Sequence, residues 1–428
     1  CVMIKTIKYS KNVDLEKELA RSQFSYDDVN ETVESILKDV KARGDKALIE
    51  YTEKFDGVKL ENLEVTQEEI QKAFDTIDKE LMEVIQYSHD NIKKFHEKQV
   101  RNDFLIRQEN GVILGQVVNP IEKVGLYVPG GTAAYPSTVL MNAVPAKIAG
   151  CDEIIMVTPP TADGTILSSI LVAAKISGVD RIFKVGGAQS IAALSYGTET
   201  VPKVYKIGGP GNIYVAMAKK MVYGEVSIDM IAGPSEVLII ADESADPVHT
   251  AADLLSQAEH DKLAACILVT TSEKLANEVT KELEKQLKEL PREEIARTSI
   301  ETQGRIVIVD NMDDAVFVSN YVAPEHLELA VDNPFELLPR IKNAGSIFMG
   351  HNTPEPIGDY LAGPNHTLPT SGTAKFSSPL SVDDFVKKSS FIYYSKQGLE
   401  EVKDKVIKFA ENEGLTAHAR SVSKRFDK

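Results

Sequence analysis

Hydrophobic residues in the first part of the chain recur at helical spacing. The segment "FSYDDVNETVESILKDVKARG" has an apolar helical face formed by Val29, Val33, Ile36, Leu37 and Val40. In "TQEEIQKAFDTIDKELMEVI", Thr66 and Glu69 have the spacing of a capping box, which marks the start of a helix. We therefore expect the first 115 or so residues to be helical, with the charged positions forming solvated helix surface.

From about residue 118 the pattern changes to short apolar runs separated by glycine-rich turns and helix-length segments. The runs are "KVGLYVPGG", "EIIMVTPP", "RIFKVGG", "KVYKIGGPG" and "EVLIIAD". The segments "STVLMNAVPAKIAG" and "ILSSILVAAKISG" suit crossover helices. Strands that alternate with helices in this way predict a parallel sheet and the α/β class.

A second set of apolar runs follows, namely "AACILVTTS", "GRIVIVD" and "GSIFMG", and a small helical tail is expected beyond about residue 380. The pattern predicts an α/β protein with two parallel-sheet domains. The helical region 1–117 is expected to pack with 237–378 as one domain, and 118–236 forms the other. Residues 379–428 form the C-terminal helical tail.

Composition and charge narrow the class of partner. The chain has 428 residues, of which 43% are hydrophobic and 26% charged, and its net charge is -16. Nucleic acid and anionic membranes are therefore not expected as main partners, because phosphate groups are bound by clustered Lys and Arg. No apolar run approaches the roughly 20 residues of a membrane span. The N-terminus lacks the apolar core of a signal peptide.

The three cysteines, Cys1, Cys151 and Cys266, are far apart and odd in number. They predict neither a disulfide framework nor a cysteine metal site, which favours a reducing cytoplasm. Any metal would then be held by His, carboxylate or amide groups.

Glycine-rich turns follow several of the expected strands, at 128–137, 185–190 and 208–212, and each leads into an expected helix. Such turns let backbone N–H groups approach a dinucleotide pyrophosphate. Turns in α/β proteins are also often glycine-rich for structural reasons, and "GPGNIY" lacks the third glycine of the dinucleotide fingerprint. Asp229 lies at a suitable distance downstream for a ribose contact, but it is one acidic residue among many.

The histidines give a second set of candidates. His89 and His96 lie in the charged helical region and are expected at the surface. Gln257 and His260 are three residues apart in "DLLSQAEHDK", so on a helix they would share a face and could bind one metal. An exposed helix face explains such a pair equally well.

Three further pairs lie in unusual contexts. Asp359 and His366 belong to the long Pro- and Gly-rich segment "PIGDYLAGPNHTLPTSG", which is typical of a functional loop. Glu413 and His418 flank Gly414, which is expected to end one helix before Thr416 caps the next.

Glu325 and His326 are adjacent in "VAPEHLELAVDN", and both can carry a proton near neutral pH. Gln257, His260, Asp359 and His418 together offer donors that suit zinc. Glu325, His326, His366 and Glu413 are then left for acid–base chemistry and recognition.

Five long segments together resemble the histidinol dehydrogenase family. They are "GLYVPGGTAAYPSTVLMNAVPAKIAG", "IDMIAGPSEV", "SQAEHD", "APEHLEL" and "GDYLAGPNHTLPT". The resemblance covers essentially the whole chain. It implies an NAD-dependent zinc enzyme that oxidises L-histidinol through L-histidinal to L-histidine and uses two NAD per product. It also implies incomplete Rossmann-like domains, and an intertwined homodimer in which the C-terminal tail completes the partner's active site.

The resemblance assigns roles to residues that match the family's motifs. One zinc per subunit is implied, with the ligands Gln257, His260, Asp359 and His418. Glu325 and His326 match the acid–base pair: His326 takes the alcohol and hydrate protons, and Glu325 activates water. The residues implied to bind the substrate are Ser235, His366 and Glu413, with His326 and the zinc ligands, and those implied to bind NAD are Tyr127, Gln189 and Asn212.

Three alternatives stay open from the sequence. A paralogue on the same scaffold could oxidise a different small alcohol. A zinc hydrolase would use Glu325 to activate water and would bind no nucleotide, although the glycine turns argue against it. A non-catalytic scaffold would leave the polar residues of the loops unexplained.

Overall fold

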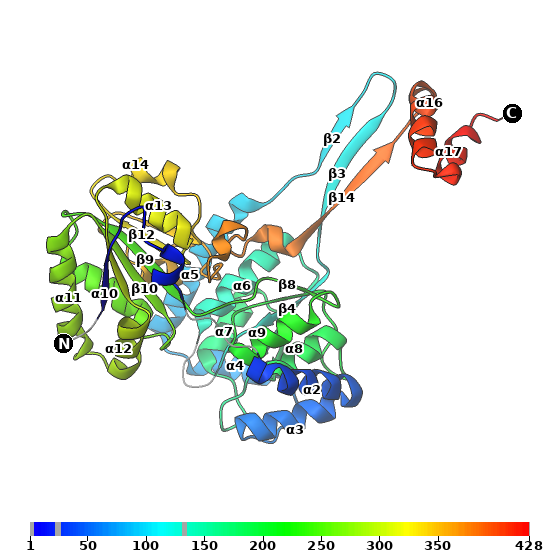
Figure 1. The fold of residues 1–428 in the computed structure, drawn as a ribbon. Helices are drawn as coiled ribbons and strands as arrows, with labels where there is room; N and C mark the ends of the chain where they lie inside the picture. The colour runs from blue at the N-terminus through cyan, green and yellow to red at the C-terminus, as the bar shows by residue number, and fades with distance from the viewer. Residues whose placement is uncertain (1–3, 22–26, 131–134, 428) are drawn as a thin grey trace. The chain divides into compact units, whose positions relative to one another are not determined.

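The structure, a computed structural model, describes residues 4–21, 27–130 and 135–427 (Figure 1). The chain forms two compact units. The first runs from the N-terminus to Gln99 and from Ile121 to Phe385, and the second comprises Val100–Pro120 and Val386 to the C-terminus.

The first unit contains a parallel five-stranded sheet in the order β6-β5-β4-β7-β8. Its strands are β4 (Lys123–Tyr127), β5 (Glu153–Thr158), β6 (Arg181–Lys184), β7 (Lys206–Gly208) and β8 (Ser227–Ile228). Numbered along the chain, this order is 3-2-1-4-5, which is the Rossmann order without its last strand. The strand order reverses between β4 and β7, and in open α/β sheets such a point is where ligands bind at the carboxyl ends.

Helices cover both faces of this sheet. On one face lie α8 (Gly187–Tyr196) and α9 (Ile213–Val222), and on the other lie α6 (Pro136–Ala149) and α7 (Ser168–Ser177). The residues of β4 to β7 are mostly buried, as the continuous apolar runs predict, whereas those of the edge strand β8 are not. All three glycine-rich turns do follow strands of this sheet, although residues 131–134 of the first lie outside the described residues.

The helices of residues 27–96 pack on the helices that cover the five-stranded sheet, whereas we expected them to pack with residues 237–378. The helices are α2 (Asp27–Arg43), α3 (Asp45–Asp56), α4 (Gln67–Thr76) and α5 (Lys79–His96). The apolar face of α2 is buried against α8 and α9, and α5 packs against α6 and α7. The capping box at the start of α4 is confirmed, because the Glu69 N–H donates to Thr66 Oγ1 and the Thr66 N–H to Glu69 Oε2.

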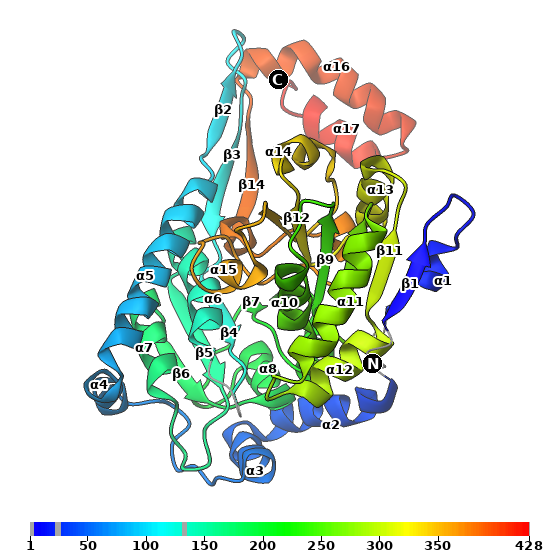
Figure 2. The ribbon, with the colours of Figure 1, turned by 90° about the vertical axis from the view of Figure 1, so that its left-hand side faces the viewer.

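The second sheet of this unit has six parallel strands in the order β1-β11-β10-β9-β12-β13 (Figure 2). They are β1 (Lys5–Lys8), β9 (Glu236–Ala241), β10 (Ala265–Thr270), β11 (Arg305–Ile308), β12 (His326–Ala330) and β13 (Ser346–Met349). Without β1 the order is again 3-2-1-4-5. Among the described strands of the N-terminal region, β1 alone joins the sheet formed by residues 237–378.

Helices also cover both faces of the six-stranded sheet. One face packs against α10 (Pro247–Ala258), α11 (Glu273–Leu287) and α12 (Glu293–Thr302). The other packs against α1 (Leu15–Glu18), α13 (Met312–Val322) and α14 (Pro334–Leu337). The short helix α15 (Glu355–Tyr360) follows β13.

The second unit is an antiparallel sheet followed by two helices. Its strands are β2 (Phe104–Arg107), β3 (Ile113–Pro120) and β14 (Val386–Tyr393), in the order β14-β3-β2. The helices α16 (Lys396–Asn412) and α17 (Thr416–Ser423) confirm the expected helical tail, and Gly414 between them has a left-handed φ of 73°. Thr416 begins α17 rather than capping it.

The α/β class with two incomplete Rossmann-like sheets is thus confirmed. The expectation that the first 115 residues are all helical is wrong at β1, β2 and the start of β3, and β14 was not expected in the tail. No helix in the described ranges is long and apolar enough to cross a membrane.

Candidate active site

A cavity of about 780 Å³ lies in the first unit, where elements of both parallel sheets meet. One part of its wall is Gly209–Gly211, the turn at the carboxyl end of β7. Another part is Glu325 and His326, at the amino end of β12. The cavity thus joins a glycine turn suited to a nucleotide with the two adjacent ionisable residues.

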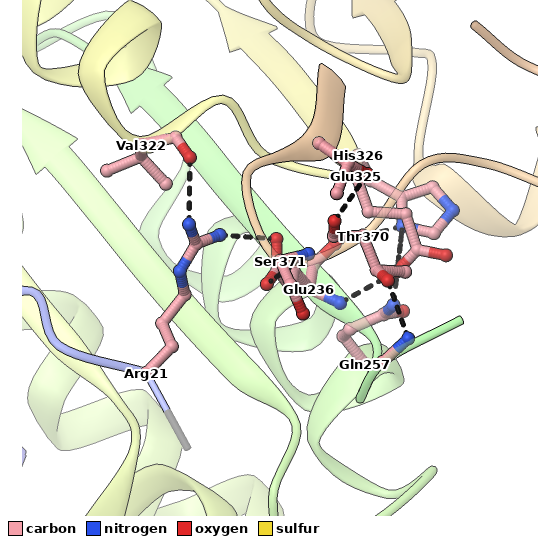
Figure 3. A network of polar contacts seen from close by, with 10 residues as sticks. Arg21, Glu236, Gln257, Val322, Glu325, His326, Thr370 and Ser371 are labelled. Atoms are coloured by element: carbon pink, nitrogen blue, oxygen red, sulfur yellow. Dashed lines mark hydrogen bonds and ion pairs between the residues drawn. The ribbon is translucent and has the colours of Figure 1, made fainter. Parts of the chain in front are cut away.

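The start of β9 holds both of these residues in place (Figure 3). Glu236 is the first residue of β9, and β12 pairs with β9 in parallel. The Glu236 N–H donates to Glu325 Oε2 at 2.8 Å, and the Glu236 carbonyl oxygen lies 2.9 Å from His326 Nδ1. One residue of the neighbouring strand therefore fixes the side chains of both Glu325 and His326.

The contact with Glu236 also sets the tautomer of His326. A carbonyl oxygen only accepts hydrogen bonds, so His326 Nδ1 carries the hydrogen and Nε2 carries the lone pair. Gln257 Nε2 lies 3.3 Å from the same Nδ1, but this amide cannot donate to a nitrogen that bears a hydrogen. The basic nitrogen Nε2 is buried and has no hydrogen-bond partner among the described residues.

Burial shifts the pKa values of the two residues in opposite directions. Desolvation lowers the pKa of His326 to about 4, which outweighs the nearby negative charge of Asp359. Desolvation also raises the pKa of Glu325 well above its ordinary value, despite the hydrogen bond from the Glu236 N–H. At neutral pH His326 is therefore an uncharged base, with a lower pKa than its ordinary value of about 6.5.

His326 belongs to a group of potential metal donors. The ligand atoms of His326, Glu355 and Asp359 lie within 4.8 Å of one another. Gln257 Oε1 and Glu355 Oε1 are buried and have no hydrogen-bond partner among the described residues. Burial and the neighbouring Asp359 raise the pKa of Glu355 to about 9. Unpartnered buried oxygens beside an imidazole are the donor set that a divalent metal ion would satisfy.

The expected metal ligands are only partly brought together. Gln257 lies in the last turn of α10 and Asp359 in α15, and both line the cavity, as does His260 just beyond α10. His260 and Gln257 therefore do not share a helix face as expected. His418 lies in α17 of the second unit.

The expected substrate residues divide in the same way. Ser235 and His366 line the cavity, and His366 Nδ1 lies 3.1 Å from the Asp359 carbonyl oxygen. Desolvation lowers the pKa of His366, although Asp359 opposes this shift. Glu413 caps the end of α16 in the second unit.

The expected NAD residues lie at the carboxyl edge of the five-stranded sheet. Tyr127 ends β4, Gln189 is in the first turn of α8, and Asn212 caps α9 through hydrogen bonds from the N–H groups of Tyr214 and Val215. Tyr127 and Gln189 are buried, and burial raises the pKa of Tyr127 to about 12. None of the three is among the residues that line the cavity.

Asp229, considered for a ribose contact, has a different role. Its carboxylate accepts the Gly209 N–H at 2.8 Å and pairs with Lys219, whose Nζ also donates to the Gly209 carbonyl at 2.9 Å. Both side chains are at most 3% exposed. The pair thus holds the two polar groups of Gly209 and is occupied with the turn itself.

Sequence reasoning also missed several residues of the site. Glu355, Glu236 and Arg21 have no local motif that marks them, because each acts through contacts with distant parts of the chain. His96 was expected at the surface but is completely buried. Its Nε2 lies 3.3 Å from Asn365 Nδ2, so it helps hold the loop that carries His366.

The fold and the cavity define an α/β enzyme that combines a Rossmann-like sheet with a buried acid–base pair. The profile of the histidinol dehydrogenase family matches residues 19–426. The chain belongs to the histidinol dehydrogenase family and is therefore an oxidoreductase.

Individual relatives agree with this family over nearly the whole chain. The histidinol dehydrogenase of Clostridium acetobutylicum is 59% identical over 399 residues, which cover 93% of each chain. That of Lactococcus lactis is 54% identical and covers 99% of this chain and 100% of its own. The crystal structure of histidinol dehydrogenase from Elizabethkingia anophelis has a TM-score of 0.94 at 42% identity, covering 99% of this chain and 98% of that chain.

Proposed function

We propose that this chain catalyses the NAD- and zinc-dependent oxidation of L-histidinol to L-histidine through L-histidinal, the final steps of histidine biosynthesis. The observation that carries the proposal is the pair Glu325 and His326, held on one residue of β9 in a cavity that extends to the Gly209–Gly211 turn. Two successive oxidations need one group for the alcohol proton and one for water, and two adjacent groups meet both needs.

The cofactors have candidate ligands in the chain. Gln257, His260, Asp359 and His418 would hold one zinc per subunit, and Tyr127, Gln189 and Asn212 would contact NAD. When bound, the zinc would help to orient the substrate, and NAD would accept the hydride released in each oxidation. The unpartnered oxygen of Gln257 in the cavity supports the metal assignment. The glycine turn at the reversal point of the five-stranded sheet supports the nucleotide.

In the first step His326 acts as the base. Its Nε2 takes the proton from the substrate hydroxyl as the hydride leaves the carbinol carbon, which gives the aldehyde. The Glu236 carbonyl accepts the hydrogen of Nδ1 and stabilises the imidazolium that forms. A neutral His326, kept so by burial, is ready for this role at neutral pH.

In the second step Glu325 activates water. The aldehyde cannot give up a second hydride until water has added to its carbonyl carbon. A carboxylate with a raised pKa is a stronger base, which suits the removal of a proton from water. His326, after releasing the first proton to solvent, takes a proton from the hydrate as the second hydride leaves, and the carboxylic acid forms.

Recognition of the substrate completes the proposal. Ser235, His366 and Glu413 would bind histidinol, together with His326 and the metal ligands. We also propose an intertwined homodimer in the cytoplasm, in which the tail of one subunit completes the partner's site.

The proposal is tested by measuring NADH formed from L-histidinol before and after chelation, and after zinc is restored. Two NADH per histidinol, lost with the metal and recovered with zinc, are expected. One NADH would indicate an alcohol dehydrogenase that stops at the aldehyde. No NADH from folded, metal-loaded protein would contradict the proposal and favour another substrate or a hydrolase.

A further inference from the structure

Arg21 lies far from the cavity residues in sequence but joins their hydrogen-bond network (Figure 3). Its Nη1 contacts Glu236 Oε2 at 2.5 Å, and its Nη2 donates to the Val322 carbonyl at 3.0 Å. The Arg21 side chain is 18% exposed and that of Glu236 is 5% exposed. A planar guanidinium with a fixed fork of donors can hold two acceptors in one geometry. Arg21 thus connects the start of β9 to the end of α13.

Both groups that Arg21 joins lead directly to the acid–base pair. Glu236 is the residue whose N–H and carbonyl hold Glu325 and His326. Val322 ends α13, and Ala323 and Pro324 alone separate it from Glu325. The Arg21 guanidinium therefore fixes the segment that carries the two residues and the peptide groups that orient them.

The backbone around this network is strained. Among the described residues other than glycine, Ala323 and Ser371 alone have a positive φ, at 52° and 54°. Ser371 donates its N–H to Glu236 Oε1 at 3.0 Å, and Ala323 follows the carbonyl that Arg21 binds. Such conformations are unfavourable for residues other than glycine and persist where surrounding contacts enforce them. Here those contacts are made by Arg21 and Glu236.

We propose that Arg21 and Glu236 are a positioning pair for the acid–base residues. The Glu236 carboxylate, bound by Arg21 and by the Ser371 N–H, anchors the start of β9 so that its peptide groups aim Glu325 and His326 at the substrate. This inference rests on the proposed roles of Glu325 and His326. Neither Arg21 nor Glu236 is proposed to touch the reacting atoms.

The test compares Arg21→Met, which keeps much of the apolar stem, with Arg21→Lys, which keeps the charge but not the fork. For Arg21→Met we expect kcat of both oxidation steps to fall about tenfold to a hundredfold, since misplacing a catalytic group by about 1 Å has effects of this size. KM for histidinol and Kd for NADH should stay close to the wild-type values. Arg21→Lys should restore part of the lost kcat, because the ion pair with Glu236 remains.

Arg43→Met is the matched control, because Arg43 also binds two acceptors, Asp39 and Glu50, but on the outer face of α2 and α3. Its kcat should match that of the wild type. Thermal unfolding of all variants separates positioning from loss of folded protein. The positioning role would be refuted if folded Arg21→Met kept wild-type kcat, or if the kcat of Arg21→Lys were no higher than that of Arg21→Met. Wild-type protein that does not oxidise histidinol would instead refute the proposed function.

A second test of the positioning pair does not depend on turnover. In protein labelled with ¹⁵N-histidine, the NMR signal of the His326 Nδ1–H group is assigned as the one that is missing from the His326→Asn variant. We expect Arg21→Met to lose or broaden this signal and Arg43→Met to retain it. An unchanged signal in Arg21→Met would show that Glu236 holds His326 without Arg21.

Discussion

At the scale of single residues, burial shifts the pKa values of two neighbouring side chains in opposite directions. Glu325 and His326 are both nearly inaccessible to solvent, and burial favours the neutral form of each. His326 is thereby kept free to accept a proton, and Glu325 is made a stronger base once it is ionised. One desolvated cavity can thus serve two different proton transfers.

The proposed division of work between these residues predicts the behaviour of Glu325→Gln. The glutamine keeps an oxygen for the Glu236 N–H but cannot take a proton from water. We expect the first oxidation to continue and the second to fall by about a hundredfold or more, the contribution typical of a general base. Histidinol should then yield one NADH instead of two, measured at 340 nm with histidinal trapped.

Glu328→Gln is the control for this change, because Glu328 is also buried on β12 but does not line the main cavity. It should still give two NADH. Equal loss of both steps in Glu325→Gln would show that Glu325 does not act on water alone.

Glu328 itself predicts a pH dependence of stability. Desolvation raises the pKa of Glu328 well above its ordinary value and also raises that of Asp253, with which it shares a hydrogen bond. A carboxyl whose folded pKa is raised contributes stability below its unfolded pKa and loses it as pH rises through the folded pKa. The free energy of unfolding should therefore decrease between about pH 6 and about pH 9.

Glu328→Gln should flatten this decrease, because the amide can accept from the Glu355 N–H and donate to Asp253 without ionising. Urea unfolding of metal-free protein at both pH values measures the effect. Glu294→Gln, at a surface position paired with Lys262, should retain the wild-type slope. A slope that is the same in Glu328→Gln and wild type would contradict the assignment to this pair.

The sequence identifies residues that form local patterns and misses those that act at a distance. Glu325, Asp359 and Ser235 lie in short, distinctive segments, and all line the cavity. Arg21 binds Glu236, 215 residues away, and no pattern within either segment indicates this contact. Burial shifts are equally hidden, because the ordinary pKa of His326 says nothing of its surroundings.

At the scale of elements, the turn between β7 and α9 packs tightly against the end of the neighbouring strand β4. Gly209 has a φ of 111°, and a Cβ at this position would lie 2.0 Å from the Tyr127 carbonyl oxygen, at the end of the adjacent strand β4. The N–H and carbonyl of Gly209 are held by Asp229 and Lys219. The turn can therefore adopt this form only with glycine.

This geometry predicts that Gly209→Ala is more damaging than a change at another glycine of positive φ. Gly224 has a φ of 103° but no atom within 4 Å of its added Cβ. Gly224→Ala should lower the free energy of unfolding by about 1–2 kcal/mol, the cost of a left-handed backbone for alanine. Gly209→Ala should cost clearly more, because backbone atoms must move.

Urea unfolding compares the two variants. Equal losses would mean that the Tyr127 carbonyl shifts freely. Loss of NADH binding in folded Gly209→Ala, with NADH binding retained in Gly224→Ala, is expected if the turn receives the cofactor.

Strands buried on both faces were predictable, and exposed strands were not. The strands β4, β5, β9 and β10 appear in the sequence as continuous apolar runs because helices cover both faces of their sheets. The strand β14, "VKKSSFIY", is exposed over nearly its whole length and has no apolar alternation to identify it. Its pairing with β3, more than 260 residues earlier, is a tertiary effect.

At the scale of the whole molecule, the two Rossmann-like sheets contribute opposite strand ends to the cavity. The five-stranded sheet provides the carboxyl end of β7, where nucleotides bind in this fold. The six-stranded sheet instead provides the amino ends of β9 and β12, where Glu236 and His326 lie. Strand order alone did not indicate this arrangement, because both sheets share the order 3-2-1-4-5.

The proposed exchange of tails predicts that two inactive variants can restore each other. His326→Asn removes the proposed base in the first unit, and His418→Asn removes a proposed metal ligand in the second unit. If the tail acts on the partner subunit, a mixed dimer contains one site in which both residues are wild type. Random mixing should then recover about a quarter of wild-type activity, since half of the dimers are mixed and half of their sites are intact.

Subunits are mixed by unfolding and refolding the two variants together, and NADH formation is measured at fixed total protein. If the tail completes the site of its own chain, each site of a mixed dimer keeps one of the two substitutions, and no activity returns. Each variant refolded alone controls for residual activity, and wild type refolded with either variant controls for refolding yield.

Zinc content adds a readout independent of turnover. His418→Asn alone should bind less than one zinc per subunit, whereas His326→Asn should retain one zinc per subunit. Recovered activity with zinc bound would therefore require a His418 supplied by the other chain.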